Sequence, residues 1–386
     1  MSSELETEDK NFNTEINSWE ELDAKINLLR GIYAYGFEKP SPIQRRAIIP
    51  LFNGKDIIAQ AQSGTGKTGC FAIGSLQCVD TEKTTPQVLI LSPTRELSLQ
   101  THKVISDIGN LFTNLNIQLL IGGTSTEANC SDLENNKPQI IVGCPGRVHD
   151  MLRRRKLTPN HLKLIVIDEA DEMLSQGFKE QVYNIFQFLP NSIQVALFSA
   201  TMPNELYSLT EKFMRNPTKI LVQTEQLTLE GIRQYYIALE NDEQKYETLK
   251  DLYSIISLSQ CIIYSNSLKR VEDLYNAMIS DGFPVCQIHS NMNKEDREES
   301  FNEFRAGRYR VLISSNVTAR GIDIQQVSTV INFDIPKDVH TYLHRIGRSG
   351  RWGRKGIGIN FATRRDYRNL KDIEEYYSTR IDELPE

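Results

Sequence analysis

The chain has 386 residues, of which 39% are hydrophobic, and a formal net charge of −6 at pH 7. This length is sufficient for two α/β domains of ordinary size and is greater than a single hydrophobic core usually supports. The acidic balance excludes a general attraction to polyanions, so any contact with nucleic acid must come from a local basic surface.

Two further features bound the class of protein. The six cysteines contain no C-x-x-C pair, which argues against a disulfide framework and a zinc site and indicates a reducing compartment. No apolar run approaches the roughly 18 residues that cross a bilayer, and the acidic N-terminus is unlike a signal peptide. We therefore expect a soluble, unsecreted protein without membrane contact.

Along the chain, residues 1–17 are polar and acidic without periodicity, which predicts a disordered tail. An amphipathic segment spans residues 19–35, and a helix is expected at 43–52 after two prolines. Short β-rich runs then alternate with helical patterns, which is typical of a parallel sheet covered by helices. These runs are residues 57–59, 88–91, 117–121, 140–142, 164–167, 194–198 and 220–222. We assign residues 18–222 to a first α/β domain.

A polar stretch at residues 223–233 predicts a linker, and the alternation restarts after it. The strands expected there are residues 234–239, 261–264, 285–289, 311–314, 327–333 and 358–361. The helices expected between them include residues 244–256, 271–279, 294–304 and 339–346. We assign residues 234–386 to a second α/β domain, which carries no glycine-rich phosphate loop of its own.

Residues 61–68 read Ala-Gln-Ser-Gly-Thr-Gly-Lys-Thr and lie between an expected strand and an expected helix. The glycines at 64 and 66 let successive backbone N–H groups converge on a phosphate, and the helix adds its positive dipole end. In such a loop Lys67 reaches the β- and γ-phosphates and Thr68 ligates Mg²⁺. The structural alternative is a glycine turn that binds nothing, which the flanking strand and helix disfavour.

A second candidate site lies where the aliphatic run 164–167 leads into Asp168 and Glu169. An acid after such a strand lies at the carboxyl edge of the sheet, where ligands of open α/β sheets bind. Asp168 can hold Mg²⁺ through water, and Glu169 can orient or deprotonate an attacking water. The alternative is an acidic first turn that complements a helix dipole, which explains the charge but not the preceding strand.

A third candidate is the run at residues 344–351, His-Arg-Ile-Gly-Arg-Ser-Gly-Arg. Arg348 and Arg351 are three residues apart, so both guanidiniums can lie on one side of a helix end. Such a pair suits bidentate contact with a γ-phosphate. For this run taken alone, a solvated basic helix end is the alternative.

With further motifs in a fixed order, the chain resembles the DEAD-box RNA helicases of superfamily 2, in particular the translation initiation factor 4A branch. The likeness extends from about Trp19, the upstream aromatic residue of the first motif, to Glu386. The further motifs are residues 36–44 (Gly-Phe-Glu-Lys-Pro-Ser-Pro-Ile-Gln), 93–97 (Pro-Thr-Arg-Glu-Leu), 122–123 (Gly-Gly), 145–147 (Pro-Gly-Arg), 168–171 (Asp-Glu-Ala-Asp), 199–201 (Ser-Ala-Thr) and 319–323 (Ala-Arg-Gly-Ile-Asp). The resemblance implies two RecA-like parallel-sheet domains in tandem, joined by a short linker.

On the nucleotide side, the resemblance implies that Phe37 stacks on adenine and that Gln44 bonds its edge, since an amide pairs with both a donor and an acceptor. Asp323 is expected to bind the ribose of ATP. The residues expected to bind the phosphates and Mg²⁺ are Gln62, Ser63, Gly64, Thr65, Gly66, Lys67, Thr68 and Asp168. The expected catalytic groups are Lys67, Asp168, Glu169, His344, Arg348 and Arg351.

The resemblance also implies that RNA is held by phosphates and 2′-hydroxyls with little sequence preference. The residues expected to contact it are Pro93, Thr94, Arg95, Gly123, Arg147, Arg297 and Ser315. The residues expected to couple nucleotide to RNA are Ser199, Thr201, Arg320 and His344. We expect a monomer that works in the cytoplasm with a scaffold of the initiation-factor 4G type; a nuclear, splicing-linked role is the alternative.

Four departures from the family pattern all concern the RNA side. Cys144 stands where a Thr normally precedes Pro-Gly-Arg, and residues 315–316 (Ser-Asn) replace Thr-Asp. Lys294 replaces a Gln three residues before Arg297, and residues 264–267 (Tyr-Ser-Asn-Ser) only approximate aromatic-Cys-Asn-Thr. The first change removes a hydroxyl donor and the second a carboxylate, whereas the ATP side matches the family throughout.

The sequence therefore predicts an ATP-dependent RNA helicase, an RNA-stimulated ATPase that locally unwinds or remodels RNA, with translation initiation as the expected process. The alternative is an ATP-gated RNA clamp or scaffold-binding protein with little turnover, which the departures on the RNA side would permit. A metabolite kinase is disfavoured because it would leave Asp323 and the arginines of the second domain without a role.

Overall fold

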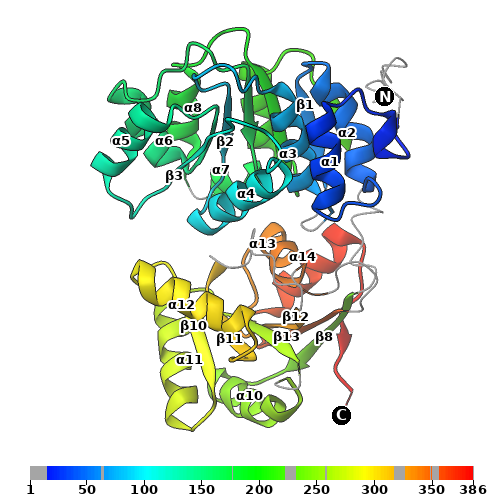
Figure 1. Ribbon diagram of the computed structural model, residues 1–386. Helices are drawn as coiled ribbons and strands as arrows, with labels where there is room; N and C mark the ends of the chain where they lie inside the picture. Colours follow the sequence, from blue (N-terminus) through cyan, green and yellow to red (C-terminus); the bar gives the residue numbers. More distant parts are fainter. Residues whose placement is uncertain are drawn as a thin grey trace, which may run out of the picture. The chain divides into compact units, whose positions relative to one another are not determined.

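The computed structural model describes most of the chain. The described residues are 15–61, 65–175, 177–221, 232–256, 259–316, 327–347, 349 and 356–385. They divide into two compact units: unit 1 comprises the described residues up to 221, and unit 2 comprises those from 232 onward. Each unit is built on a parallel sheet with helices packed against it (Figure 1). The predicted fold class, two parallel-sheet α/β domains in tandem, is confirmed.

Unit 1 contains a seven-stranded sheet in the order β3-β4-β2-β5-β6-β1-β7, and neighbouring strands are parallel throughout. Its strands are β1 (Ile57–Gln60), β2 (Val88–Leu91), β3 (Ile117–Leu120), β4 (Ile140–Gly143), β5 (Leu164–Ile167), β6 (Gln194–Ser199) and β7 (Thr218–Leu221). The central strands are continuous aliphatic runs because both of their faces are buried. Since all strands run in one direction, their carboxyl ends share one edge of the sheet, where ligands of such sheets bind.

Alternate residues of each strand face two different layers of helices. In β1, Ile57 and Ala59 belong to one hydrophobic core and Ile58 belongs to the other. The first core is covered by α1 (Ile26–Ala34), α2 (Pro42–Phe52), α3 (Lys67–Cys78) and α4 (Arg95–Ile108). The second core is covered by α5 (Thr126–Asn136), α6 (Pro145–Arg153), α7 (Ala170–Ser175), α8 (Lys179–Phe186) and α9 (Asn204–Phe213).

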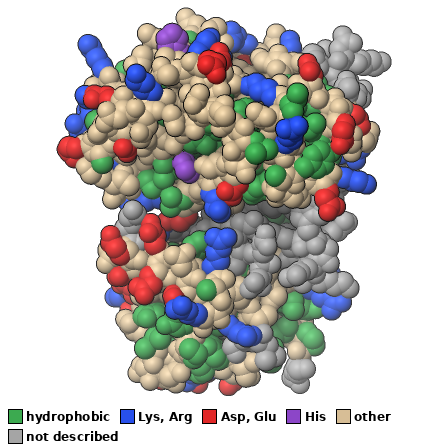
Figure 2. Space-filling model, in the orientation of Figure 1, with side chains coloured by type: hydrophobic (Ala, Val, Ile, Leu, Met, Phe, Trp, Pro, Cys, Tyr) green, Lys and Arg blue, Asp and Glu red, His purple; other side chains and the backbone are tan. Residues whose placement is uncertain are grey.

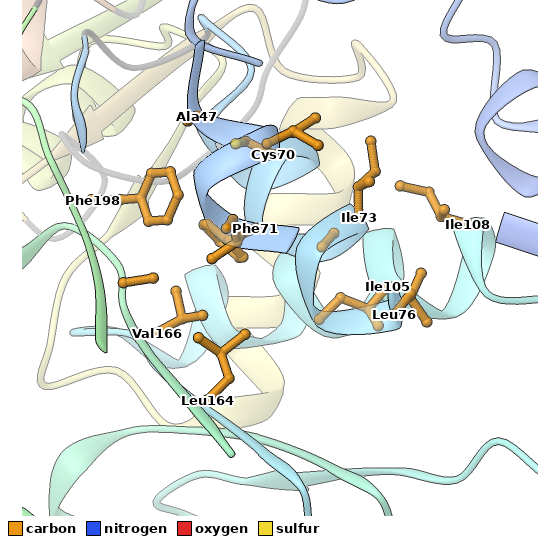
Figure 3. Packing of buried hydrophobic residues seen from close by; sticks show 14 of the residues in the cluster. Ala47, Cys70, Phe71, Ile73, Leu76, Ile105, Ile108, Leu164, Val166 and Phe198 are labelled. Carbon is orange, nitrogen blue, oxygen red and sulfur yellow. The ribbon is translucent and has the colours of Figure 1, made fainter. Parts of the chain in front are cut away.

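Helix α3, which follows the predicted phosphate loop, is anchored within the first core (Figure 3). Phe71 packs edge-on against Phe198 of β6, with ring centroids 5.2 Å apart. On another side of the helix, Ile73 lies beside Ile108 of α4. All four side chains are fully buried, and burial of each such side chain stabilises the fold by roughly 1.5–3 kcal/mol. The first turn of α3 is therefore held in a fixed place at the edge of the sheet.

Unit 2 repeats this architecture with a seven-stranded parallel sheet in the order β10-β11-β9-β12-β13-β8-β14. Its strands are β8 (Ile232–Ala238), β9 (Gln260–Tyr264), β10 (Val285–Ile288), β11 (Val311–Ser314), β12 (Val327–Asn332), β13 (Gly356–Ala362) and β14 (Asp382–Glu383). One core lies under α12 (Lys294–Arg305), α13 (Val339–Ile346) and α14 (Tyr367–Tyr377). The other core lies under α10 (Asp242–Ile256) and α11 (Leu268–Ser280).

The structure corrects the predicted limits near the N-terminus and at the linker. Residues 15–17, predicted to belong to a disordered tail, are ordered: Ile16 is 1% exposed and its N–H donates to the carbonyl of Arg45 at 3.1 Å. Ile16 is one of a few scattered apolar residues in a polar stretch, which gives too weak a periodic signal to predict order and explains the error. The segment 19–35 is two elements, a 3-10 turn η1 (Trp19–Glu21) followed by α1. Strand β8 begins at Ile232, inside the predicted linker.

Strand β14 is absent from the sequence prediction. It pairs in parallel with β8, with Asp382 opposite Tyr235. Its two residues are exposed and acidic, so no hydrophobic alternation marks them as a strand. No helix in the described part of the chain is both long enough and apolar enough to span a membrane.

Candidate functional site

In unit 1, the residues that the sequence singles out gather beyond the carboxyl ends of the strands. Each of six strands runs into one of the predicted motifs. The predicted residues at this edge are Lys67 after β1, Pro93 to Arg95 after β2, Gly123 after β3, Arg147 after β4, Asp168 and Glu169 after β5, and Ser199 and Thr201 at the end of β6. The parallel topology thus brings together segments that are far apart in the sequence.

The described part of the phosphate loop, Thr65 and Gly66, leads directly into α3. Gly66 has a φ of 103° and forms the N-cap of the helix, a left-handed conformation that glycine adopts without strain. A Cβ at this position would also lie only 2.6 Å from the hydroxyl of Ser41 and 2.9 Å from the amide nitrogen of Gln44. Gly66 is therefore required both by the turn and by the close approach of α2.

Lys67, the first residue of α3, is only 5% exposed. Its ammonium donates to the carbonyl of Ala61 at 2.9 Å and lies 3.3 Å from Oε1 of Glu169. An ammonium has three N–H donors, and its contacts with the described residues use two of them, so one is left for a phosphate oxygen. The side chain joins the phosphate loop to the acidic turn after β5, as the two sequence motifs require.

The acidic turn is buried and conformationally strained. Asp168 and Glu169 are 2% and 3% exposed, and the N–H of Glu169 donates to Oδ1 of Asp168 at 3.0 Å. Burial and the neighbouring carboxylate of Glu169 raise the pKa of Asp168 well above its usual range, with Lys67 opposing the shift. Glu169 has a φ of 48°, which costs a residue with a Cβ roughly 1–2 kcal/mol. Such strain is typical of functional turns.

Asp171 is absent from the predicted site residues, yet it joins the turn after β5 to the end of β6. Its Oδ2 accepts hydrogen bonds from the N–H and the hydroxyl of Thr201 at 3.2 and 2.7 Å. Its own N–H donates to the hydroxyl of Ser199 at 3.3 Å, and that hydroxyl donates to the carbonyl of Thr201 at 2.6 Å. Movement of residues 199–201 would therefore displace Asp171, which lies two residues after Glu169 in the sequence.

Gln44 is held in a defined orientation against the phosphate loop. Its Oε1 accepts from the N–H of Ser41 at 2.8 Å, and its Nε2 donates to the carbonyl of Gly66 at 3.1 Å. A primary amide has two donors and two acceptor lone pairs. Its bonds to the described residues leave one donor and one acceptor lone pair, which is the pattern that the exocyclic amine and ring nitrogen of adenine would satisfy.

Phe37 lies beside Gln44 against the same helix. A Cβ on Gly69 of α3 would be 2.8 Å from the Phe37 ring, so the glycine lets the ring approach the helix closely. Trp19 stacks behind Phe37 with centroids 6.3 Å apart, and its indole N–H donates to the Phe37 carbonyl at 2.9 Å. Tyr35 packs edge-on at 4.8 Å. These contacts fix the position of an aromatic ring that is only partly buried.

On the other side of the sheet edge, four predicted RNA contacts follow β2 and β3. Pro93 is buried, and Thr94 forms the N-cap of α4, its Oγ1 accepting from the N–H of Leu97 at 3.2 Å. The cap occupies only a lone pair, so the hydroxyl proton can still be donated. Gly123 has a φ of 81°, and a Cβ there would be 2.5 Å from Nη1 of Arg95. The predicted residues Arg95 and Gly123 are thus brought together.

Arg147, a further predicted RNA contact, is largely engaged within unit 1. Its Nη1 donates to the hydroxyl of Thr124 at 3.1 Å and to Oδ1 of Asn129, and its Nη2 donates to the Thr124 carbonyl at 2.9 Å. Within the described part of the chain, three of the five guanidinium donors therefore organise the loop after β3, and two are left for a ligand. The departure at Cys144 precedes this helix: its side chain makes no capping bond to α6, and Sγ lies 3.6 Å from the hydroxyl of Ser98.

In unit 2, Arg297 and Ser315 occupy different surroundings. Arg297 lies on α12 among exposed acidic residues, and Figure 2 shows acidic side chains gathered over this helix. Ser315 follows β11 and is 8% exposed, and its hydroxyl has no hydrogen-bond partner among the described residues. An unpaired buried hydroxyl costs roughly 1–3 kcal/mol, which a bound phosphate or 2′-hydroxyl could offset.

Arg345, which the sequence prediction omits, is fully buried in unit 2. Its guanidinium donates to Oδ1 of Asn316 from Nε (2.9 Å) and Nη2 (2.6 Å). It also donates to Oδ1 of Asn266 at 2.7 Å, to Oδ1 of Asn332 at 3.1 Å and to the carbonyl of Asp334 at 2.7 Å. Burial lowers its pKa to about 10, so it is charged at neutral pH. It lies in a run of six consecutive buried residues of α13, Thr341 to Ile346.

The remaining predicted residues divide into two groups. His344 is buried on α13, next to Arg345. The others lie outside the residues that the structure describes, and their roles stay predictions; these are Gln62, Ser63, Gly64, Arg320, Asp323, Arg348 and Arg351.

Comparison with known proteins identifies both units. The family model described as DEAD/DEAH box helicase matches residues 41–209, and the helicase conserved C-terminal domain matches residues 244–353. "ATP-dependent RNA helicase eIF4A" of Pyricularia oryzae is 51% identical over 377 residues, which cover 98% of this chain and 95% of the relative. "Eukaryotic initiation factor 4A" of Caenorhabditis elegans is 50% identical over 376 residues, 97% of this chain and 93% of the relative.

A solved structure extends the likeness to three dimensions. Dbp5 of S. cerevisiae, bound to RNA and ADP BeF3, matches with a TM-score of 0.89 and 37% identity over 96% of each chain. The two sheets of this chain are therefore RecA-like domains, and the predicted resemblance to initiation factor 4A is confirmed. The chain belongs to the DEAD-box helicase family and is an ATP-dependent RNA helicase.

Proposed function

We propose that this enzyme is an RNA-stimulated ATPase that locally separates short RNA duplexes during translation initiation. The observation that carries the proposal is the cluster of Lys67, Asp168 and Glu169, in which one cation and two carboxylates are buried beside the phosphate loop. The printed names of the relatives, ATP-dependent RNA helicase eIF4A and eukaryotic initiation factor 4A, support the choice of process.

At the nucleotide, Phe37 stacks on adenine and Gln44 reads its edge with the donor and the acceptor that its internal bonds leave. Lys67 neutralises the β- and γ-phosphates with its third N–H. Glu169 orients or deprotonates the attacking water, and its ion pair with Lys67 sets the direction of its carboxylate. The remaining contacts are proposed from the sequence pattern; they are those of Gln62, Ser63, Gly64 and Thr65 to the phosphates and of Asp323 to the ribose.

The donor set of unit 1 fits Mg²⁺. The hydroxyl of Thr68 and the carboxylate of Asp168 are hard oxygen ligands of the kind that Mg²⁺ prefers. Asp168 is 2% exposed, so a cation bound there would be held by a buried carboxylate. When bound, the ion would neutralise the negative charge that develops on the phosphates during hydrolysis.

Hydrolysis in this proposal needs groups from both units. Arg348 and Arg351 act as arginine fingers on the γ-phosphate, and His344 and Arg320 couple that contact to RNA. RNA is held in unit 1 by Thr94, Arg95, Gly123 and Arg147 and in unit 2 by Arg297 and Ser315. The unpaired hydroxyl of Ser315 and the free proton of the Thr94 hydroxyl support these contacts. Since they address the backbone, little sequence preference follows.

The proposal for partners and compartment is supported by the likeness to initiation factor 4A. We propose a monomer that works in the cytoplasm with a scaffold of the initiation-factor 4G type. An affinity capture from lysate, with and without ribonuclease, tests the scaffold: recovery of an initiation complex that survives ribonuclease supports it, and recovery of splicing components instead would move the enzyme to the nucleus.

The enzymatic proposal is tested by ATP hydrolysis with and without single-stranded RNA, and by separation of a short RNA duplex. We expect RNA to stimulate hydrolysis, DNA of the same sequence to do so much less, and strand separation to require ATP. The Glu169→Gln variant is the matched control that binds without turnover. ATP-dependent RNA binding by the wild-type enzyme with no hydrolysis would instead favour an RNA clamp.

A further inference from the structure

The first described residues of unit 1 form an ordered strap beside α2. This N-terminal strap, residues 15–22, contains the turn η1. Its apolar side chains recur at every third position, Ile16, Trp19 and Leu22, and all three are buried in the first hydrophobic core. The strap therefore follows a fixed course over the surface of unit 1, because its apolar side chains anchor it at three points.

Arg45 of α2 fastens the start of the strap to this helix. The N–H of Ile16 donates to the Arg45 carbonyl at 3.1 Å, and the Ile16 carbonyl accepts from Nε of Arg45 at 3.2 Å. Nη2 of Arg45 also donates to Oδ1 of Asn17. A guanidinium presents its donors in a rigid fork. Bonds from Nε and Nη2 to two consecutive residues therefore fix both the position and the direction of the strap.

Arg46, the next residue of α2, makes a weaker contact with the same strap. Its Nε lies 2.7 Å from Oε1 of Glu15, and its side chain is 54% exposed. Arg45 also lies near Glu15, at 3.7 Å. Exposed ion pairs of this kind contribute little because water and salt screen them. Within the described part of the chain, both arginines thus share Glu15, whereas the bonds to Ile16 and Asn17 belong to Arg45.

The strap is connected to both residues that are proposed to bind adenine. Trp19 stacks against Phe37, and its indole N–H donates to the Phe37 carbonyl at 2.9 Å. Gln44 directly precedes Arg45, and successive side chains of a helix are about 100° apart. Helix α2 therefore presents Gln44 to the carbonyl of Gly66 and Arg45 to the strap. The spacing between the Phe37 ring and the Gln44 amide thus depends on how the strap is held on α2.

We propose, on the basis of the function proposed above, that Arg45 is a positioning residue for the adenine base of ATP. Its guanidinium holds the strap, the strap holds Trp19, and Trp19 holds the ring of Phe37 where it stacks on the base whose edge Gln44 reads. Arg45 does not touch ATP. Its loss should weaken binding of the base and leave binding of the phosphates unchanged.

The test compares Arg45→Ala with Arg46→Ala in the full-length enzyme. The measurements are Kd for ATP, Kd for inorganic tripolyphosphate, and kcat at saturating ATP and RNA. Because Arg45→Ala removes two hydrogen bonds of a charged group, we expect Kd for ATP to rise about tenfold. Kd for tripolyphosphate and kcat should not change, since the phosphate site lies elsewhere. Arg46→Ala should change each quantity by no more than about twofold.

Trp19 provides a direct measurement of the strap. The chain has two tryptophans, so in a Trp352→Phe background the emission comes from Trp19 alone. Trp19 is fully buried. Release of the strap by Arg45→Ala should therefore shift its emission to longer wavelength and expose it to quenching by iodide, whereas Arg46→Ala should do neither. Arg45→Lys keeps a donor for the Ile16 carbonyl and should recover part of both the ATP affinity and the wild-type emission.

ATP binding of wild-type strength in Arg45→Ala would overturn the proposal. Equal losses of ATP and tripolyphosphate affinity would also overturn it, because they would indicate a general loss of structure. Weakened ATP binding with unchanged Trp19 emission would overturn it too, since the strap would still be in place. If the wild-type enzyme itself bound ATP and GTP equally, the proposed adenine site would fail, which distinguishes that failure from a failure of Arg45.

Discussion

The ammonium of Lys67 lies 3.3 Å from Oε1 of Glu169, and the two side chains are 5% and 4% exposed. The pair joins the first residue of α3 to the strained turn after β5. Removing one partner of a buried ion pair leaves an uncompensated charge and costs roughly 3–5 kcal/mol. Lys67 therefore serves both the phosphate site and the geometry of the acidic turn.

Lys67→Ala should abolish ATP hydrolysis and weaken nucleotide binding, because it removes the cation nearest the phosphates and releases Glu169. Glu169→Gln should keep ATP binding and slow hydrolysis, since an amide still accepts from the ammonium but is a poor base. Nucleotide affinity and single-turnover hydrolysis measure the two effects. Equal loss of nucleotide binding in both variants would contradict the assigned roles.

A second expectation concerns the adenine edge. In Gln44→Glu the side chain can still accept from the N–H of Ser41, but it cannot donate to the carbonyl of Gly66 and presents no donor to adenine. Loss of a hydrogen bond at a site built for it costs roughly 1–3 kcal/mol. ATP affinity should fall about tenfold or more, with a loss of preference for ATP over GTP.

The matched control for this change is Gln77→Glu. Gln77 also bridges two backbone groups, accepting from the N–H of Lys25 at 3.1 Å and donating to the carbonyl of Asp23 at 2.9 Å. It lies at the other end of α3 from the phosphate loop. Competition binding with ATP and GTP measures both variants, and an ATP preference that survives Gln44→Glu would show that the amide does not read the base.

Much of this site could be predicted because its signals are local. The phosphate loop is one strand, one turn and one helix start within a dozen residues, and Ser41 with Gln44 three residues later is the pattern of a helix N-terminus. The aliphatic run before Asp168 identified its place at the sheet edge. In these cases chemistry and secondary structure are encoded in the same short stretch.

The parts that escaped prediction depend on contacts between distant segments. The bond between Asp171 and Thr201 spans 30 residues, and those from Arg345 to Asn316 and Asn266 span 29 and 79. No periodicity reports such pairings. The left-handed backbone of Glu169 could not be anticipated either, because residues with a Cβ seldom adopt it. Only the packed sheet imposes that conformation.

A third expectation concerns Arg348 and Arg351, which lie outside the described residues. Either change to Ala should lower kcat on the order of 10³-fold if the side chain is a true arginine finger. Arg364→Ala is the matched control, because Arg364 is an exposed arginine of the same unit. Rates are compared at saturating RNA and ATP. Normal hydrolysis by both variants would show that neither arginine is a finger and that residues 344–351 form only a basic surface.

A fourth expectation concerns the pH dependence of stability. Burial lowers the pKa of His289, which is 4% exposed, and nearby Arg297 acts in the same direction while Glu272 opposes it. Below a pH of about 6.5, the ordinary histidine pKa, the unfolded chain binds a proton that the folded chain resists. Stability must therefore fall as the pH drops through this range.

His289→Gln should flatten that fall, because glutamine does not titrate. The difference in thermal midpoint between pH 7.5 and pH 5.5 is the measurement, with His161→Gln at an exposed position of unit 1 as the control. The control should retain the wild-type pH dependence. A wild-type pH dependence in His289→Gln would mean that other groups cause the acid sensitivity.

The last expectation uses the departure at Cys144. This residue is the N-cap of α6, but its side chain makes no capping bond to that helix, and its Sγ lies 3.6 Å from the hydroxyl of Ser98. In Cys144→Thr a hydroxyl oxygen can accept from an N–H of the first turn, which stabilises a helix by roughly 1 kcal/mol. For a unit of this size the thermal midpoint should rise by about 2–4 °C.

The matched control is Cys144→Val, since valine has the shape of threonine without the hydroxyl. If capping is the cause, the threonine variant alone gains stability, and its hydroxyl proton can also be donated to an RNA phosphate. The threonine variant should then need less RNA for half-maximal stimulation of ATP hydrolysis than either the wild type or the valine variant. Equal midpoints for threonine and valine would show that side-chain shape, and not the missing hydroxyl, is what the departure changed. If Cys144→Thr raises the thermal midpoint but does not lower the RNA requirement, the hydroxyl caps the helix and does not contact RNA.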